Sequence, residues 1–204
     1  MLEVRALSQI IKDVRENGFS VLESYLQGEE LETLKNACLR ELKTSNDKYS
    51  FGDNRKYFGN YPDDIAGFFK DELMESFREE WKCKTTSLYI THEYKQGTLP
   101  RNAYLHFDEQ HHLKFFFYLV DVDENCGPLT VCPKSHKKSE EIRQGSWSEN
   151  KIEVGYPGIA NDYEQIPIVG PAGSLIIFDT NCWHKGGQVE PDHERLIVRS
   201  HCRL

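Results

Sequence analysis

The sequence predicts a mainly β fold whose N-terminal helices pack on one face of an all-β core. Apolar side chains recur at helical spacing in residues 1–83, whereas residues 84–204 carry short β-branched and aromatic runs separated by Gly, Pro, Asn and Asp. With 204 residues and 38% hydrophobic content, the chain is long enough for one sizeable core and short for two. We therefore expect residues 1–204 to form a single domain, with a helical cover in 1–83 and the β core in 84–204.

Three helices are predicted in the N-terminal part. The stretches VRALSQIIKDVRENG (residues 4–18) and GEELETLKNACLRELK (residues 28–43) each place apolar residues three and four positions apart, and Gly18 is a stop signal for the first. A third pattern of this kind runs from Ile65 to Trp81. The polar, aromatic-rich segment YSFGDNRKYFGNYP (residues 49–62) lies between the second and third patterns and is expected to be a connection.

Six runs in the C-terminal part read as strands, which suggests a sandwich or a barrel. They are TTSLYITHEY, NAYLHFD, LKFFFYLVDV, GPLTVCP, GSLIIFD and RLIVRSHC, at residues 85–94, 102–108, 113–122, 127–133, 173–179 and 195–202. Residues 137–165 interrupt them and read as a long insert of the kind that often carries function.

Composition and charge exclude several classes of partner. The net charge of −8 disfavours nucleic acid or an anionic membrane surface as the main partner. No segment resembles a signal peptide or a membrane span, so we expect a cytoplasmic protein whose partner is a small molecule. The six cysteines form no C-x-x-C pair and are expected to be thiols without disulfides.

The motif His106-Phe107-Asp108 is one half of a candidate metal site. Side chains at i and i+2 of a strand point to the same side, so His106 and Asp108 can converge on one ion. Alone, such a motif also fits the polar end of a buried strand. The segment GPAGSLIIFDTNCWHKGG (residues 170–187) adds His184 at the end of a second apolar strand. Two imidazoles and one carboxylate with open positions favour non-haem Fe(II), with zinc as the alternative.

A cation is expected near this site. Arg195 lies 11 residues beyond His184 in the run ERLIVRSHC, and its planar guanidinium suits a bidentate contact with a carboxylate. We interpret Arg195 as the anchor for a dicarboxylate, with Arg199 on the same strand face as a weaker candidate. Lys114 and Phe116 lie two positions apart and so share one face of another strand. Lys114 either contacts a carboxylate of the cosubstrate or substrate, or extends to the barrel mouth.

In this combination of motifs the sequence resembles the phytanoyl-CoA dioxygenase family of Fe(II)/2-oxoglutarate oxygenases. The resemblance covers roughly residues 88–204 and rests on LHFDE, KFFFYLVDVDENCGPLTVCPKSHK, the GSLIIFD run with Trp183-His184, and Arg195. The chain departs from the family in two places: Lys134 stands where glycine is usual, and His184 is followed by KGG without a hydroxyl residue.

The resemblance implies a double-stranded β-helix (jelly-roll or cupin-like) in which His106, Asp108 and His184 bind Fe(II). It also implies that Arg195 holds 2-oxoglutarate, that Phe116 lies against it, and that O2 converts it to succinate and CO2 while a small-molecule substrate is oxidised. Because related halogenases lack the carboxylate ligand, Asp108 implies hydroxylation or another non-halogenating oxidation.

Two other functions stay open from the sequence. One is a non-catalytic double-stranded β-helix that serves as a binding or sensor module, and the other is a zinc-dependent cupin-like hydrolase or isomerase. An open metal site together with a dicarboxylate anchor argues for the oxygenase. Substrate selectivity resides in loops, and we expect residues 49–62 and 145–165, at the barrel mouth of the resembling fold, to close over the substrate.

Overall fold

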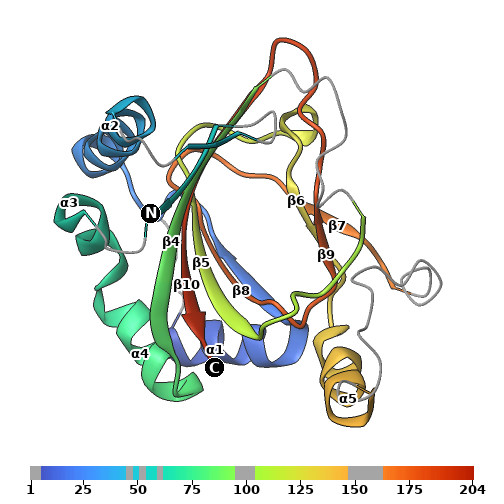
Figure 1. The fold of residues 1–204 in the computed structure, drawn as a ribbon. Coiled ribbons are helices and arrows are strands. Elements are labelled where there is room, and N and C mark those ends of the chain that lie inside the picture. The colour runs from blue at the N-terminus through green and yellow to red at the C-terminus, as the bar shows by residue number, and fades with distance from the viewer. Residues whose placement is uncertain (1–5, 45–47, 51–53, 59–61, 95–103, 147–162) are drawn as a thin grey trace.

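The computed structural model describes residues 6–44, 48–50, 54–58, 62–94, 104–146 and 163–204. Two antiparallel sheets face each other, and helices cover the outer side of the larger one (Figure 1). The helical elements are α1 (Leu7–Asn17), α2 (Gly28–Thr44), α3 (Asp63–Ala66), the 3-10 turn η1 (Gly67–Phe69), α4 (Glu72–Trp81), the 3-10 turn η2 (Glu124–Cys126) and α5 (His136–Ser146).

The larger sheet has seven strands in the order β1-β8-β5-β10-β4-β3-β2. Its strands are β1 (Phe19–Leu22), β2 (Lys48–Ser50), β3 (Asn54–Phe58), β4 (Lys84–Tyr94), β5 (His112–Tyr118), β8 (Leu175–Asp179) and β10 (Glu194–Arg203). The smaller sheet has the order β7-β6-β9, formed by β6 (Leu129–Val131), β7 (Ile166–Ile168) and β9 (His184–Gly186). This arrangement of two facing antiparallel sheets is the double-stranded β-helix that the family resemblance implies.

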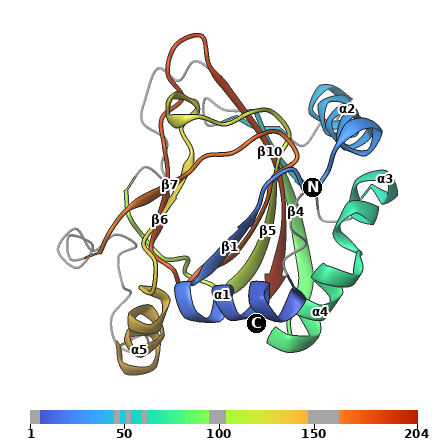
Figure 2. The same ribbon diagram turned by 180° about the vertical axis from the view of Figure 1, so that it is seen from behind.

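The larger sheet separates two layers of core. Successive side chains of a strand point to opposite faces, so Phe115 and Phe117 of β5 pack toward α1 to α4, whereas Phe116 and Tyr118 pack toward the smaller sheet. The view from behind shows α1 running across one end of the sheet and α5 standing apart, below the smaller sheet (Figure 2). The inner face of β5 and β10 is therefore the wall available for a site.

The first two helices agree with the sequence pattern, and the third pattern divides. α1 ends at Gly18, whose φ of 90° lies in the left-handed region. The third pattern forms α3, η1 and α4, because Asp71 starts a new helix by accepting a hydrogen bond from the Met74 N–H at 2.8 Å. All six cysteines lie within the described ranges and are buried free thiols.

The N-terminal part also contributes strands that the sequence analysis did not predict. β1 pairs with β8, and β2 and β3 extend the larger sheet beyond β4, so residues 1–83 are more than a helical cover. β3 and all but the first residue of β2 lie in the segment 49–62, which was expected to be a connection. Short strands of three to five residues, without clear alternation, give too weak a pattern to detect.

The predicted strand at residues 102–108 is wrong where the structure describes it. Residues 104–108 form one isolated bridge, in which His106 and His184 exchange two backbone hydrogen bonds of 3.0 and 2.8 Å. The Asp108 N–H donates to the Thr180 carbonyl at 3.1 Å, so residues 104–108 pair with β9 at His106 only. Residues 95–103 and 147–162 lie outside the described part of the chain, so only the first part of the predicted insert is placed, as α5.

Candidate active site

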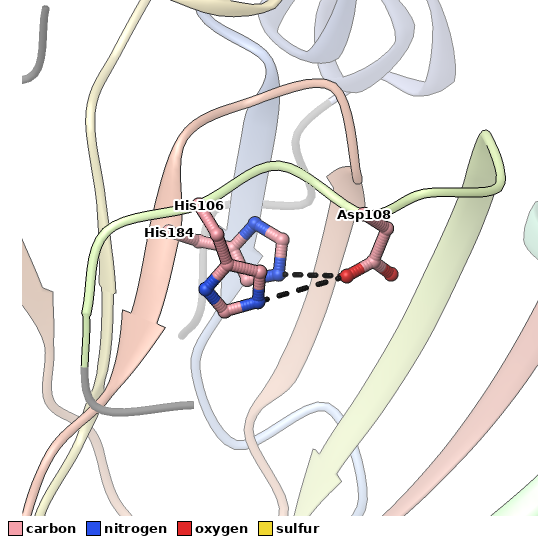
Figure 3. A group of neighbouring side chains, drawn as sticks. All are labelled: His106, Asp108 and His184. Atoms are coloured by element: carbon pink, nitrogen blue, oxygen red, sulfur yellow. Dashed lines mark ion pairs between the residues drawn. The ribbon is translucent and has the colours of Figure 1, made fainter. Parts of the chain in front are cut away.

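The structure brings His106, Asp108 and His184 together as a group able to hold a metal ion (Figure 3). One candidate ligand atom from each residue lies within 4.8 Å of the others. Asp108 Oδ1 is 3.8 Å from His106 Nε2 and 3.4 Å from His184 Nε2. The bridge between His106 and His184 sets the two imidazoles side by side, with ring centroids 4.5 Å apart. Two segments distant in sequence thus converge, as the motif analysis expected.

Backbone carbonyls orient both imidazoles. The Nδ1 of His106 lies 2.8 Å from the Tyr104 carbonyl, and the Nδ1 of His184 lies 2.7 Å from the Cys182 carbonyl. A carbonyl only accepts, so each Nδ1 carries the proton and each Nε2 has its lone pair free toward Asp108. Burial and the neighbouring His184 lower the pKa of His106 to about 4, which keeps this ring neutral at physiological pH. Both rings are therefore prepared as metal ligands.

Lys114 contacts the other oxygen of Asp108. Its Nζ lies 2.5 Å from Asp108 Oδ2, and the lysine is buried. Burial raises the pKa of Asp108, but the attraction of Lys114 and His184 outweighs it and holds that pKa well below its usual range. Burial lowers the pKa of Lys114, and Asp108 opposes that shift. Lys114 is thus bonded to Asp108, and its Nζ also lies 5.6 Å from the centroid of the Phe178 ring. A contact of Lys114 with a cosubstrate stays a prediction.

Arg143 of α5 holds the backbone next to Asp108, and the sequence analysis missed it. Its guanidinium donates to the carbonyls of Asp108 and Glu109 and to Oδ1 of Asn181, the last two at 2.6 Å. It also lies over the ring of Phe107. This one side chain ties α5 to both segments that carry the candidate ligands. Its position in a predicted insert, 35 residues from Asp108, gave no sequence signal.

Arg195 is buried and bound to Glu93 of β4, a contact that the sequence analysis also missed. The two residues lie opposite each other in the register of β10 and β4. The Nε and one terminal nitrogen of Arg195 both donate to Glu93 Oε2, with the Nε distance being 2.7 Å. A guanidinium has five N–H donors. Glu93 accepts from one edge of the Arg195 guanidinium, and Arg195 also lines the cavity described below, where its other donors can face a ligand.

A cavity of about 160 Å³ joins the candidate metal group to the inner face of the larger sheet. Lys114, Phe116, Arg195 and Arg199 all line it, together with His106, Asp108 and His184. Arg199 lies between the rings of Tyr89 and Phe116, 5.2 and 5.4 Å from their centroids. Every residue predicted for metal or cosubstrate binding therefore lines one cavity.

The departure at Lys134 has a local structural reason. Its φ is 68°, a left-handed conformation in which glycine pays no steric cost. Lysine adopts this conformation at a steric cost that glycine would avoid. The Lys134 N–H donates to the Asn17 carbonyl at 2.8 Å, so the turn is attached to the end of α1 and lies outside the cavity lining.

The fold and the site place the chain among double-stranded β-helix proteins with a His, Asp, His group. More particularly, the chain belongs to the phytanoyl-CoA dioxygenase (PhyH) family, whose model matches residues 14–197. No curated protein matches the chain. Within the described residues, no helix is both long enough and apolar enough to cross a membrane.

Solved structures share the fold at low sequence identity. The non-heme alpha ketoglutarate dependent carbocyclase SnoK from nogalamycin biosynthesis has a TM-score of 0.73 at 16% identity, covering 98% of this chain and 84% of its own. EctD from S. alaskensis, solved with 2-oxoglutarate and 5-hydroxyectoine, has a TM-score of 0.73 at 15% identity, covering 100% and 78%. HygX from Streptomyces hygroscopicus, solved with nickel, 2-oxoglutarate and hygromycin B, has a TM-score of 0.66 at 14% identity, covering 96% and 86%.

Proposed function

We propose that the protein is an Fe(II)/2-oxoglutarate-dependent oxygenase that hydroxylates or otherwise oxidises a small molecule. The observation that carries this proposal is the convergence of two oriented Nε2 atoms and one carboxylate oxygen in a cavity that also contains a buried arginine. Two imidazoles and one carboxylate leave coordination positions open, as this chemistry needs for cosubstrate and oxygen. Family membership and the cofactors present in EctD and HygX support it.

The donor set fits iron better than a closed structural zinc site. The group contains nitrogen and oxygen donors without sulfur, and only three described residues contribute to it. When bound, Fe(II) with 2-oxoglutarate would activate O2, which is the oxidant for both the substrate and the 2-oxoglutarate, with succinate and CO2 as co-products. A zinc-dependent hydrolase has no use for a dicarboxylate anchor, and a pure binding module needs neither feature.

The chain's own residues then have separate tasks. His106, Asp108 and His184 hold the metal, and the Tyr104 and Cys182 carbonyls fix the two rings. Lys114 neutralises Asp108 and occupies its Oδ2, which leaves Oδ1 as the oxygen that would be available to a metal. Arg195 binds the far carboxylate of 2-oxoglutarate by charge-assisted hydrogen bonds, and Phe116 packs against that molecule from the sheet.

Succinate formation that depends on both Fe(II) and 2-oxoglutarate tests the proposal directly. The assay uses a library of small molecules and reads succinate above the rate without substrate, while mass spectrometry detects the gain of one oxygen atom or the loss of two hydrogen atoms. Anaerobic titration of Fe(II) in the presence of 2-oxoglutarate measures binding independently. Zinc-dependent hydrolysis, or tight 2-oxoglutarate binding without any turnover, would favour the two alternatives.

Single substitutions test the metal group. His106→Ala, Asp108→Ala and His184→Ala are each expected to abolish turnover and to weaken Fe(II) binding, because the loss of one of three ligands leaves an incomplete site. His111→Ala is the matched control, since His111 lies near Asp108 in sequence but pairs with Asp179 at 2.7 Å. Near-normal turnover in any of the three variants contradicts the assignment.

A further inference from the structure

A further cavity opens at the end of the inner sheet face that lies away from Arg195. Its volume is about 210 Å³, and it is bounded by the first residues of β4 and β5 and the last residues of β10. Every side chain that lines it carries a hydrogen-bonding group, and among the described residues none of the lining side chains is aliphatic or a carboxylate. The lining consists of Thr86, Ser87, Tyr89, Gln110, His112, His201 and Arg203.

This cavity adjoins the candidate metal group. His201 lies opposite Lys114 in the register of β10 and β5, and Lys114 is bonded to Asp108. Gln110 and His112 follow Asp108 within four residues of the chain. Arg195 lies six residues from His201 along β10, which corresponds to roughly 20 Å of strand. The cavity and the predicted cosubstrate anchor therefore lie toward opposite ends of the same wall.

The surroundings of the cavity favour a negatively charged occupant. Arg203 lies at its exposed rim, and Arg199 and Lys114 lie immediately next to it on the sheet. The nearby carboxylate of Asp108 is already bonded to Lys114. Burial, with Lys114 and Arg199 close by, holds the pKa of His201 well below its usual value, so this ring is neutral. Because Asp108 already offsets the charge of Lys114, a bound anion would interact chiefly with the arginines, above all with Arg203 at the rim.

His201 supplies an unsatisfied hydrogen-bonding group inside the cavity. The residue is 9% exposed, and its Nε2 is buried without a hydrogen-bond partner in the described part of the chain. The ring packs between Tyr89 and His112, at centroid distances of 4.6 and 5.4 Å, which fixes its orientation. Buried polar atoms in native proteins usually have partners. In the tautomer that carries its proton on Nε2, this ring can donate a hydrogen bond to a ligand bound in the cavity.

We propose that this cavity binds the oxyanion group of a small, polar substrate, with the His201 imidazole as hydrogen-bond donor and Arg203 as charge partner. The inference rests on the proposed function, because it assigns the substrate class of the same site. A long hydrocarbon chain is disfavoured, since it would bury seven polar side chains without replacing their contacts with water. The substrate class is thus a compact carboxylate, phosphate or sulfate compound rather than a long acyl chain.

The test measures binding without turnover, on the full chain loaded with Zn(II) and saturated with 2-oxoglutarate. Benzoate and its neutral isostere benzamide are titrated while the imidazole ¹⁵N resonances of His201 and His112 are followed by NMR. We expect saturable shifts with benzoate and none with benzamide. Inorganic phosphate in a separate titration distinguishes a phosphate site from a carboxylate site. Equal shifts with benzoate and benzamide, or no shift with either anion, overturn the proposal.

Substitutions at two positions locate the effect. Arg203→Gln, on an exposed side chain, is expected to weaken benzoate binding about threefold, as is typical of an exposed ion pair. His201→Phe keeps a ring in the stack but removes the donor, and is expected to weaken binding about fivefold, in the range of one hydrogen bond. Arg40→Gln, an exposed arginine on α2, is the control and should leave binding unchanged. If Arg203→Gln binds benzoate like the parent, the proposal fails even where His201→Phe does not fold.

Failure of this inference is separable from failure of the proposed function. If Fe(II)-dependent and 2-oxoglutarate-dependent succinate formation occurs but no oxyanion shifts His201, the oxygenase stands and the substrate class is wrong. If benzoate shifts His201 in the same way without metal, and no succinate is formed under any condition, the anion site stands and the oxygenase proposal is wrong.

Discussion

Arg195 illustrates how one side chain can serve two partners. Glu93 accepts hydrogen bonds from the Nε edge of Arg195, and Arg195 also lines the cavity near the candidate metal group. An arginine fixed in this way loses less conformational entropy when a second carboxylate arrives than a free side chain would. The pair with Glu93 therefore fixes the guanidinium, as the proposed contact with 2-oxoglutarate requires.

Arg195→Lys is expected to raise the KM for 2-oxoglutarate strongly while the fold survives. An ammonium group cannot form two parallel hydrogen bonds, and the loss of a charged hydrogen bond costs about 1.5–3 kcal/mol, or roughly tenfold or more in affinity. Succinate assays over a range of 2-oxoglutarate concentrations measure it. If Arg199→Lys gives this phenotype and Arg195→Lys does not, Arg199 is the anchor and the assignment is wrong by four residues.

Glu93→Gln tests whether Glu93 positions Arg195. Glutamine keeps the size of the side chain but removes the charge that fixes the guanidinium, so we expect a higher KM for 2-oxoglutarate and a lower melting temperature. Fe(II) affinity, measured by anaerobic titration, should be unchanged, because Glu93 has no described contact with the metal group. A fall in Fe(II) affinity equal to the rise in KM would instead indicate a general loss of structure.

The sequence predicted the candidate ligands better than the residues that support them. The H-x-D motif and the His184 turn are local patterns, so His106, Asp108 and His184 could be selected without a structure. Glu93 is 102 residues from Arg195, and only the pairing of β4 with β10 brings them together. A single sequence contains no signal for such a contact.

At the scale of elements, Arg143 attaches α5 to the segments that carry the candidate metal ligands. Arg143→Met removes the hydrogen bonds to the Asp108 and Glu109 carbonyls while keeping the length of the side chain. We expect weaker Fe(II) binding and a loss of about 0.5–1.5 kcal/mol in unfolding free energy, since two partly exposed carbonyls lose a hydrogen-bond donor. Isothermal titration and urea denaturation measure the two effects.

Lys138→Met on the same helix is the matched control. Its ammonium pairs with Glu141 on the exposed surface, where ion pairs contribute little. The control should change neither Fe(II) affinity nor stability measurably. Equal effects of the two substitutions would show that α5 responds to loss of positive charge in general, and that the contacts of Arg143 are not special.

Long, buried strands could be predicted from the sequence, whereas short strands could not. The long, buried runs of β4, β5, β8 and β10 were visible as β-branched and aromatic stretches. β7 and β9 have three residues each and include Pro167 and Lys185, which do not suggest strands. Their pairing with β6 decides their conformation, so tertiary context rather than local preference forms the smaller sheet.

For the whole molecule, the lowered pKa values of three histidines predict a loss of stability in acid. The pKa of His106 falls to about 4 in the folded protein, against about 6.5 when unfolded. The unfolded state then binds a proton that the folded state does not, so stability is complete above pH 6.5 and decreases as the pH falls toward 4. At about 1.4 kcal/mol per unit, the shift of His106 corresponds to roughly 3 kcal/mol. The lowered pKa values of His112 and His201 act in the same direction.

Urea denaturation of the metal-free protein between pH 7 and pH 4.5 measures this dependence. His106→Gln should flatten the profile, because the variant cannot take up the proton at this position on unfolding. Adding Zn(II) should steepen it, since protons then compete with the metal for the imidazoles. Stability that is constant over this range in the metal-free protein would show that the histidines are not shielded as the structure indicates.

The position of β10 between β4 and β5 also governs when the protein can fold. Tyr94 pairs with Glu194, and Leu22 pairs with Leu175, so the larger sheet joins strands separated by 100 and 153 residues. During synthesis, β4 and β5 leave the ribosome with an unfilled gap between them and exposed edges that invite aggregation. Closure of long loops before their contacts form makes such folding slow. Nascent chains ending at residue 193 should therefore be protease-sensitive, and resistance should appear only once residue 203 has emerged.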